Sequence, residues 1–226
     1  MTRVFQNRTE AGRRLGQALY RYAGRSDTLV LALPRGGVPV GFEVARAIGA
    51  PLDLLLVRKL GVPGQEELAM GAIASGGVQV LNPDLVASLG LDAEVIAASA
   101  AREQRELARR ESAYRGDRPP PAIAGRCVIL VDDGLATGAT MRAAVAALRQ
   151  QQPGRIVVAV PVAPPDTVAR LRAEADDVIC LEAPAAFFAI GPWYREFPQL
   201  TDNEVRELLA EAWRDSGAGD DGRSAP

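Results

Sequence analysis

Short apolar runs alternate along the chain with longer segments in which apolar residues recur every three or four positions. The runs are typical of buried strands, and the recurring pattern is typical of amphipathic helices. Strands are predicted at 28–33, 52–57, 128–131, 155–162 and 177–181. Helices are predicted at 38–48, 92–114 and 141–150, with others starting near residues 8, 165 and 202. This alternation predicts an α/β fold with a mainly parallel central sheet, flanked by helices on both faces.

Glycine and proline mark the segments between these elements. Residues 60–70 have no sustained period and hold two glycines and a proline, so a loop is predicted there. Residues 71–75 and 78–81 flank a pair of glycines, which predicts a small hairpin. No internal repeat or second domain is evident. We expect one domain at 1–214 and a disordered tail at 215–226, where Gly, Asp, Ser and Pro dominate.

Composition narrows the class of protein. Of 226 residues, 24% are charged and 48% are hydrophobic, as in ordinary soluble globular proteins. The net charge of −2 gives no reason to expect a nucleic-acid surface, and no apolar run approaches a membrane span. Cys127 and Cys180 lie alone within apolar runs, so we expect free thiols and a cytoplasmic protein. The chain has no histidine, which excludes Ser-His-Asp catalysis and histidine-based metal sites.

The stretch 128–140 combines the features of a sugar-phosphate site. Four apolar residues end at two carboxylates, Asp132 and Asp133, which can accept hydrogen bonds from neighbouring hydroxyls. A short loop then leads into the helix predicted at 141–150. The free amides and the positive dipole at the start of such a helix can receive a phosphate. The loop residues are small or carry hydroxyls and include Gly134, Ala136, Thr137, Gly138, Ala139 and Thr140.

A second glycine-rich turn follows the first predicted strand. Pro34-Arg35-Gly36-Gly37 separates that strand from the helix at 38–48. The two glycines can let their amides converge on an anion, and Arg35 adds a forked cation beside them. Lys59 follows a further predicted strand, at the edge where open α/β sheets bind ligands. These groups are candidates for binding a second anion.

The motif Asp132-Asp133-Gly134-Leu135-Ala136-Thr137-Gly138-Ala139-Thr140, preceded by an apolar strand, resembles the signature of type I phosphoribosyltransferases. The turn at 34–37 matches the place of that family's pyrophosphate loop. Leu-Pro-Arg-Gly-Gly, Val-Arg-Lys-Leu-Gly and a late aromatic segment also resemble a group of bacterial members without a known acceptor. The resemblance implies transfer of a 5-phosphoribosyl group from phosphoribosyl pyrophosphate to a nitrogen nucleophile, a nucleobase or related heterocycle, with release of pyrophosphate.

The resemblance also assigns roles, with catalysis given to Asp132, Asp133, Arg35 and Lys59. The two acids would bind the ribose hydroxyls, and residues 136–140 would bind the 5-phosphate. Pyrophosphate would be bound by Arg35, Gly36, Gly37 and Lys59. Mg²⁺ is the implied cofactor, and any protein contact to it would come from one of the acids through water. Adjacent strand residues point to opposite faces, so both acids reach the sugar only if the chain leaves strand geometry at Asp133.

Further expectations follow from the same resemblance. Residues 60–70 would be a mobile loop that closes over the site, and a small hood would be formed by the chain ends, 1–27 and 182–214, beside a core at about 28–181. We expect a homodimer without nucleic-acid or membrane partners. Hypoxanthine-guanine enzymes carry an Asp where this chain has Ala136, which disfavours a 6-oxopurine acceptor.

Several alternatives stay open. The chain could bind phosphoribosyl pyrophosphate or a nucleotide as a regulatory protein without catalysis, or it could be a phosphatase or phosphorylase. The stretch 128–140 could be an ordinary strand-to-helix turn with solvated acids. Five aromatic residues within 187–197 could stack on an acceptor ring or pin the C-terminal segment to the core. Arginines of the first helix are expected to be solvated, namely Arg8, Arg13 and Arg14.

Overall fold

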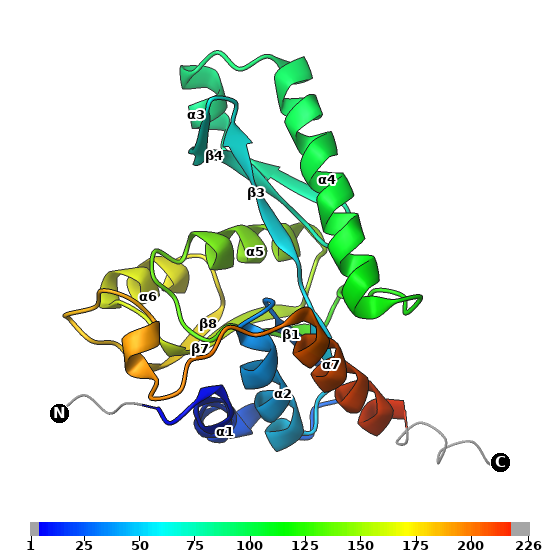
Figure 1. The fold of residues 1–226 in the computed structure, drawn as a ribbon, viewed down its shortest axis with the longest axis vertical. Helices are drawn as coiled ribbons and strands as arrows, with labels where there is room; N and C mark the ends of the chain where they lie inside the picture. The colour runs from blue at the N-terminus through cyan, green and yellow to red at the C-terminus, as the bar shows by residue number, and fades with distance from the viewer. Residues whose placement is uncertain (1–4, 218–226) are drawn as a thin grey trace.

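Five parallel strands form the central sheet (Figure 1). The computed structural model of the protein describes residues 5–217, and here the sheet has the order β2-β1-β6-β7-β8. Each neighbouring pair is parallel. The strands are β1 (Thr28–Ala32), β2 (Leu52–Leu54), β6 (Cys127–Val131), β7 (Arg155–Val162) and β8 (Asp177–Glu182). The predicted α/β fold with a mainly parallel sheet is confirmed.

Helices cover both faces of the sheet because its strands are apolar on both sides. Alternate strand residues, such as Val30 and Ile129, belong to one core, and their neighbours, such as Leu29 and Val128, belong to another. The first core is covered by α1 (Arg8–Ala18), α2 (Gly37–Ile48) and α7 (Asp202–Gly217). The second is covered by α5 (Ala139–Gln150) and α6 (Pro165–Arg172). Figure 1 shows α5 and α6 on the opposite side of the sheet from α1 and α2.

A separate antiparallel sheet forms the hood of the molecule. Its order is β3-β4-β5, and its strands are β3 (Val57–Val62), β4 (Gln65–Ala74) and β5 (Val78–Leu81). Together with α3 (Pro83–Ser88) and α4 (Ala93–Arg115) it makes a unit that we call the arm, which rises away from the central sheet in Figure 1. The prediction had placed the hood at the chain ends, because pairing within the arm leaves little trace in hydrophobic periodicity.

The prediction of a loop at 60–70 is wrong, since most of these residues belong to β3 and β4. β3 and β4 pair up to Val62 and Gln65, and Gly64 between them adopts a φ of +80° that suits a tight turn. Leu60 and Met70 are fully buried, so the core holds this hairpin in place. The predicted hairpin at 71–81 is confirmed by the pairing of β4 with β5.

A buried ion pair connects the arm to the central sheet, and a second ion pair joins two elements of the arm. Arg115, the last residue of α4, donates to the Asp53 carboxylate at 2.8 Å and to the Leu54 carbonyl oxygen, both on β2. The side chains of Arg115 and Asp53 are each only 5% exposed. Arg58 on β3 donates to Glu103 of α4 at 2.6 Å, which holds the helix against the antiparallel sheet. The position of α4 therefore depends on charge pairing as well as on apolar packing.

The C-terminal helix continues further than predicted. α7 runs to Gly217, so residues 215–217 belong to a helix, whereas the rest of the predicted tail lies outside the described residues. The Trp213 indole donates to the Leu52 carbonyl oxygen at 2.9 Å and fixes α7 to the edge of the central sheet. Cys127 and Cys180 are free thiols, as predicted. Within residues 5–217, no helix has the length and apolar character needed to cross a membrane.

Substitution Arg115→Ala should lower the free energy of unfolding by about 3 kcal/mol, because Asp53 would stay buried without its partner. Urea unfolding followed by circular dichroism measures this change. Arg105→Ala, at an exposed position of the same helix, is the control and should change stability by less than about 0.5 kcal/mol. Equal effects of the two variants would show that the buried pair does not hold the arm.

Candidate active site

The pairing of β1 with β6 brings two distant turns together. Ala32 lies opposite Val131, and the Leu33 amide donates to the Val131 carbonyl oxygen at 2.9 Å. Both strands are parallel, so the turns that follow them leave the same edge of the sheet. The turn at 34–37 and the stretch after Val131 therefore lie side by side, as the sequence interpretation required.

Glycine is needed in the first turn because the second turn touches it. A Cβ atom added to Gly37 would lie 2.7 Å from the Val131 carbonyl oxygen, and one added to Gly36 would overlap the Asp133 carboxylate. The Gly37 amide donates to the Leu33 carbonyl oxygen at 3.0 Å, within the turn itself. These glycines thus serve close packing of the turns, in addition to any approach of an anion.

Both carboxylates face the first turn. β6 ends at Val131, so the chain has left strand geometry before either acid. Asp132 accepts a hydrogen bond from the Asp133 amide at 2.8 Å, and its oxygen lies 3.3 Å from the position a Cβ of Gly37 would take. The Asp133 carboxylate lies against Gly36. The chain thus leaves strand geometry where the prediction requires it, and both acids lie beside the turn at 34–37.

Burial governs the protonation of this pair. Burial and the neighbouring charge of Asp133 raise the pKa of Asp132 well above its ordinary value. Burial also raises the pKa of Asp133, while its hydrogen bond from Arg8 opposes the shift. Two carboxylates this close are more easily ionised when one of them has a cationic partner. Asp133 has this cationic partner in Arg8, whereas within residues 5–217 Asp132 accepts a hydrogen bond only from the neutral Asp133 amide.

Arg8 is the residue of this site that the sequence interpretation missed. It was expected to be solvated, yet it is only 9% exposed. Its Nε donates to Asp133 at 2.8 Å, its Nη1 donates to the Pro198 carbonyl oxygen at 2.8 Å, and its guanidinium lies 3.8 Å over the Phe197 ring. The capping Asn7 fixes the start of α1 and places Arg8 in its first turn. Only this start position hinted that Arg8 could point inward.

The two chain ends meet in an aromatic cluster beside Asp133. Phe5 pairs with Tyr194 through a parallel bridge, and their rings are 5.4 Å apart. Tyr194 is buried and donates its hydroxyl to the Asp133 carbonyl oxygen at 2.5 Å. Burial and the charge of Asp133 raise the pKa of Tyr194, so it stays a donor. Of the two roles considered for the aromatics, the buried Trp193 and Tyr194 perform the pinning role. Phe197 is only partly buried and faces a cavity, and Phe188 is 94% exposed.

The loop after the acids is held by hydrogen bonds to β7 and α6 and leaves its tip exposed. The Leu135 amide donates to the Val162 carbonyl oxygen, and the Thr167 hydroxyl donates to the Ala136 carbonyl oxygen. Gly138 caps α5 with a φ of +71°, a conformation that suits glycine. The exposed residues at the tip and at the start of the helix are Ala136, Thr137, Ala139 and Thr140. The arrangement can present backbone amides and hydroxyls to an anion.

A cavity of about 410 Å³ lies between the first turn and Asp133. Its walls include Arg8, Arg35, Gly36, Asp133 and Phe197. The Pro34–Arg35 peptide bond beside it is cis. This cavity unites the predicted Arg35 and Asp133 with the unpredicted Arg8. Among the described residues, no cluster of three or more acidic or cysteine side chains could hold a metal ion.

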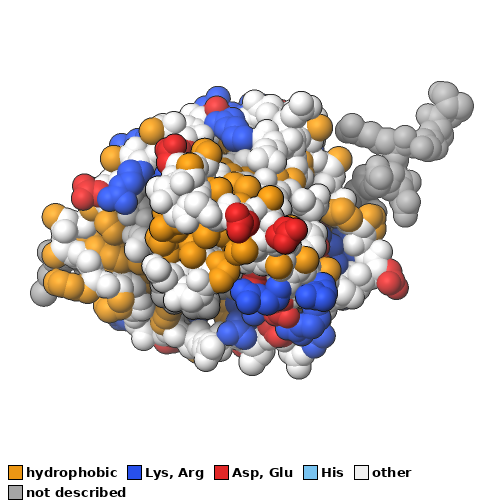
Figure 2. Space-filling view, turned by 90° about the horizontal axis from the view of Figure 1, so that it is seen from above, with side chains coloured by type: hydrophobic (Ala, Val, Ile, Leu, Met, Phe, Trp, Pro, Cys, Tyr) orange, Lys and Arg blue, Asp and Glu red, His pale blue; other side chains and the backbone are white. Residues whose placement is uncertain are grey.

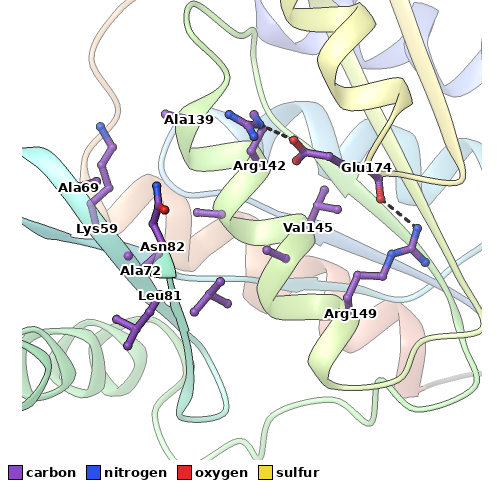
Figure 3. A pocket seen from close by; sticks show the side chains of 14 residues that line it. Lys59, Ala69, Ala72, Leu81, Asn82, Ala139, Arg142, Val145, Arg149 and Glu174 are labelled. Atoms are coloured by element: carbon purple, nitrogen blue, oxygen red, sulfur yellow. Dashed lines mark hydrogen bonds and ion pairs between the residues drawn. The ribbon is translucent and has the colours of Figure 1, made fainter. Parts of the chain in front are cut away.

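Lys59 lies on the wall of a different cavity. This second space, of about 500 Å³, separates the arm from α5 and is shown in Figure 3. Lys59 shares its lining with Asn82 on one side and with Ala139 and Arg142 on the other. Lys59 is therefore near the start of α5, which the sequence linked to a phosphate, and is not brought together with Arg35 here.

Residues 3–196 match the family model of the phosphoribosyl transferase domain. The chain belongs to this family. Curated proteins from two strains of Mycobacterium tuberculosis, provisionally named phosphoribosyl transferases, are 49% identical over 213 residues, or 94% of this chain and 48% of theirs. The chain thus spans about half the length of these relatives. The crystal structure of TT1426 from Thermus thermophilus is 46% identical, with coverage of 92% and 98% and a TM-score of 0.84.

The family membership confirms the predicted resemblance and the type I phosphoribosyltransferase fold. It also makes the ordinary-turn interpretation of 128–140 the weaker one. Within the phosphoribosyl transferase domain, the structure brings together Arg35, Gly36, Gly37, Asp132 and Asp133. Residues 136–140 follow them on the same loop. The roles of these residues stay predictions, as does the assignment of Lys59.

The two acids should have opposite effects on stability. A carboxyl whose pKa is raised in the folded protein stabilises it fully at low pH, and this contribution is lost as pH rises through the raised pKa. Asp132→Asn should therefore raise the free energy of unfolding at pH 7, on the order of 1 kcal/mol, and this advantage over the unsubstituted protein should shrink as pH falls. Asp133→Asn should instead lower it, because the loss of the buried partner of Arg8, about 3 kcal/mol, outweighs the gain from removing a carboxyl whose own pKa is raised by burial.

Urea unfolding at pH 5 and pH 7 measures both effects. Asp117→Asn, at an exposed position outside the site, is the control for loss of one carboxylate. If Asp132→Asn and Asp133→Asn were equally destabilising, the assignment of a charge partner to only one acid would be wrong.

Proposed function

We propose that the chain transfers a 5-phosphoribosyl group from phosphoribosyl pyrophosphate to a nitrogen nucleophile and releases pyrophosphate. The acceptor in this proposal is a nucleobase or a related heterocycle. One observation carries it: the contact between the turn at 34–37 and the two acids, with an open helix start on the same loop. Such a surface offers a cation, two diol acceptors and a phosphate cradle within one edge of the sheet.

Each part of the donor has a proposed partner. Asp132 and Asp133 accept hydrogen bonds from the ribose hydroxyls, and the amides and hydroxyls of 136–140 receive the 5-phosphate. Arg35 and the turn Gly36–Gly37 meet the pyrophosphate. Gly37 contributes through its missing side chain, since its amide already donates to Leu33.

Lys59 remains a proposed pyrophosphate ligand under one condition. It stands on β3 of the arm, in a cavity lined by Ala139 rather than by Arg35. Its contact with pyrophosphate therefore depends on movement of the arm toward β1. A closing arm would also exclude water from the reacting sugar carbon, which transfer to an acceptor other than water requires.

The proposed catalysis is electrostatic. Negative charge grows on the departing pyrophosphate while positive charge grows on the sugar ring, and these charges need partners that are already in place. Arg35 lies where the first charge develops. The acids lie beside the ring, and Arg8 and Tyr194 hold Asp133 from two sides. Preorganisation of Asp133 thus depends on both ends of the chain.

The donor set is consistent with Mg²⁺ as the proposed cofactor. Two adjacent carboxylates, without a third acidic ligand among the described residues, suit a hard cation held mostly by substrate oxygens and water. When bound, the ion neutralises charge on the pyrophosphate. Asp132 is the acid without a cationic partner of its own and is the better candidate for an outer contact.

The proton of the acceptor has few possible destinations. The chain has no histidine, so an acceptor that is already ionised, or a carboxylate, must manage this proton. Ala136 is exposed at the loop tip and carries no acid for a 6-oxopurine. Adenine-type or orotate-type acceptors suit this arrangement better. A homodimer and a cytoplasmic location are also part of the proposal.

Donor binding is tested by calorimetry with phosphoribosyl pyrophosphate and Mg²⁺. Asp132→Asn should weaken binding at least tenfold, because hydrogen bonds to a charged group contribute about 1.5–3 kcal/mol. The same variant should be more stable than the unsubstituted protein, so lost binding could not be ascribed to unfolding. Asp117→Asn should bind normally. Undiminished binding by Asp132→Asn would refute the assignment of the ribose hydroxyls.

Turnover is tested by pyrophosphate release with a panel of nucleobases, amines and small nitrogen heterocycles. Release should require both an acceptor and Mg²⁺, and Arg35→Gln should lower kcat at least tenfold because it removes the cation at the leaving group. An inactive protein that still binds the donor would support the regulatory, non-catalytic alternative.

A further inference from the structure

A further, smaller cavity adjoins Arg35. Its volume is about 200 Å³, and it is lined by Arg35, by the α4 residues Arg109, Arg110 and Tyr114, and by Asp202 of α7. Arg35 also lines the 410 Å³ cavity that contains Asp133, so the two spaces share this side chain as a wall. The loop after β1, the arm and the C-terminal helix all meet here.

The charge around this cavity is positive. Three guanidinium groups face two carboxylates, since Arg109 and Arg110 both donate to Glu106, at 2.8 and 2.9 Å, and Asp202 is the other acid. Burial and Asp202 raise the pKa of Tyr114 to about 12, while the charges of Arg35 and Arg110 oppose this shift. The fields of two arginines from separate segments therefore reach one hydroxyl.

Arg35 is only loosely held on this side. Its guanidinium is 3.8 Å from Asp202, longer than a hydrogen bond, whereas Asp202 accepts a 2.6 Å hydrogen bond from the Tyr114 hydroxyl. Arg35 is 40% exposed and can turn its fork to a ligand at small cost. Figure 2, which looks onto the arm, shows basic side chains gathered in one area with acidic ones among them.

We propose that this cavity is a second anion subsite that binds a phosphoryl group, with Arg109 and Arg110 of the arm as ligands beside Arg35. Guanidinium groups bind phosphoryl oxygens in a forked geometry, and three of them around one small space favour a multiply charged anion. A space of 200 Å³ equals about seven water volumes of roughly 30 Å³, enough for one phosphoryl group.

The inference rests on the proposed function and extends it. The phosphoryl group could be the outer phosphate of the donor's pyrophosphate, reached past Arg35, or it could belong to a separate phosphorylated compound. Either ligand would compete with Asp202 for Arg35 and would bring the arm into contact with the site. A phosphoryl group bound there would contact α4 of the arm and Arg35 at the same time, and so would link the position of the arm to the leaving group.

Calorimetry with inorganic pyrophosphate tests the subsite. The variant Arg109→Gln/Arg110→Gln should bind pyrophosphate at least tenfold more weakly than the unsubstituted protein. Asp202→Asn should bind it more tightly, because an acid that competes for Arg35 is removed. The control is Arg102→Gln/Arg105→Gln, which removes the same charge from exposed positions of the same helix and should change the affinity less than threefold. Circular dichroism establishes that each variant is folded.

Two results would overturn the subsite: unchanged pyrophosphate affinity in Arg109→Gln/Arg110→Gln, or an equal loss in the control, which would indicate only the net charge of the helix. The ligand's source follows from a parallel titration with phosphoribosyl pyrophosphate. If Arg109→Gln/Arg110→Gln weakens binding of both phosphoribosyl pyrophosphate and pyrophosphate, the subsite holds the donor's leaving group. If the variant weakens binding of pyrophosphate alone, the subsite holds a separate phosphate.

Ribose 5-phosphate separates this inference from the proposed function. The unsubstituted protein and Arg109→Gln/Arg110→Gln should bind it equally, since its partners are the acids and residues 136–140. If pyrophosphate bound through the arm and ribose 5-phosphate did not bind at all, the subsite would stand and the proposed function would fail. The reverse result would reject the subsite and leave the proposed function intact.

Discussion

The parallel pairing of β1 with β6 is the constraint on which the candidate site depends. Because Ala32 lies opposite Val131, the two turns leave the sheet in contact, and Gly36 and Gly37 have no room for side chains. A shift of this register would separate Arg35 from the acids. Both strands are fully buried, and each lies between two neighbouring strands of the central sheet.

Charge compensation links this edge of the sheet to both chain ends. Asp133 could not be buried as an anion without Arg8, and Arg8 is itself held by Phe197 and the Pro198 carbonyl oxygen. The Tyr194 hydroxyl donates to the backbone carbonyl oxygen of the same acid, Asp133. Burial raises the pKa of both acids, but of the two only Asp133 accepts a hydrogen bond from a cation of the described chain, which opposes its shift, and this gives the two acids different chemical character.

The arm is connected to the sheet through charge on its inner side. Arg115 pairs with Asp53 on β2. The preceding residue, Tyr114, and the arginines one to two turns earlier, Arg110 and Arg109, line the space beside Arg35. The same helix thus carries a structural pair and groups suited to an anion. A change in the position of α4 would alter the surroundings of Arg35 without altering the turn that carries it.

Much of this protein is determined locally. Apolar strands, the two glycine-rich turns and the motif at 132–140 are short-range patterns, so the parallel fold, the family and most of the candidate site could be predicted from them. The inward position of Arg8, the strands within 60–70 and the placement of Lys59 away from Arg35 could not. Arg8 and Lys59 depend on partners far along the chain, and hydrophobic periodicity carries no information on distant partners. The strands within 60–70 pair with each other across the turn at Gly64, in a stretch that shows no sustained period. Tertiary structure alone decided which charges face one another.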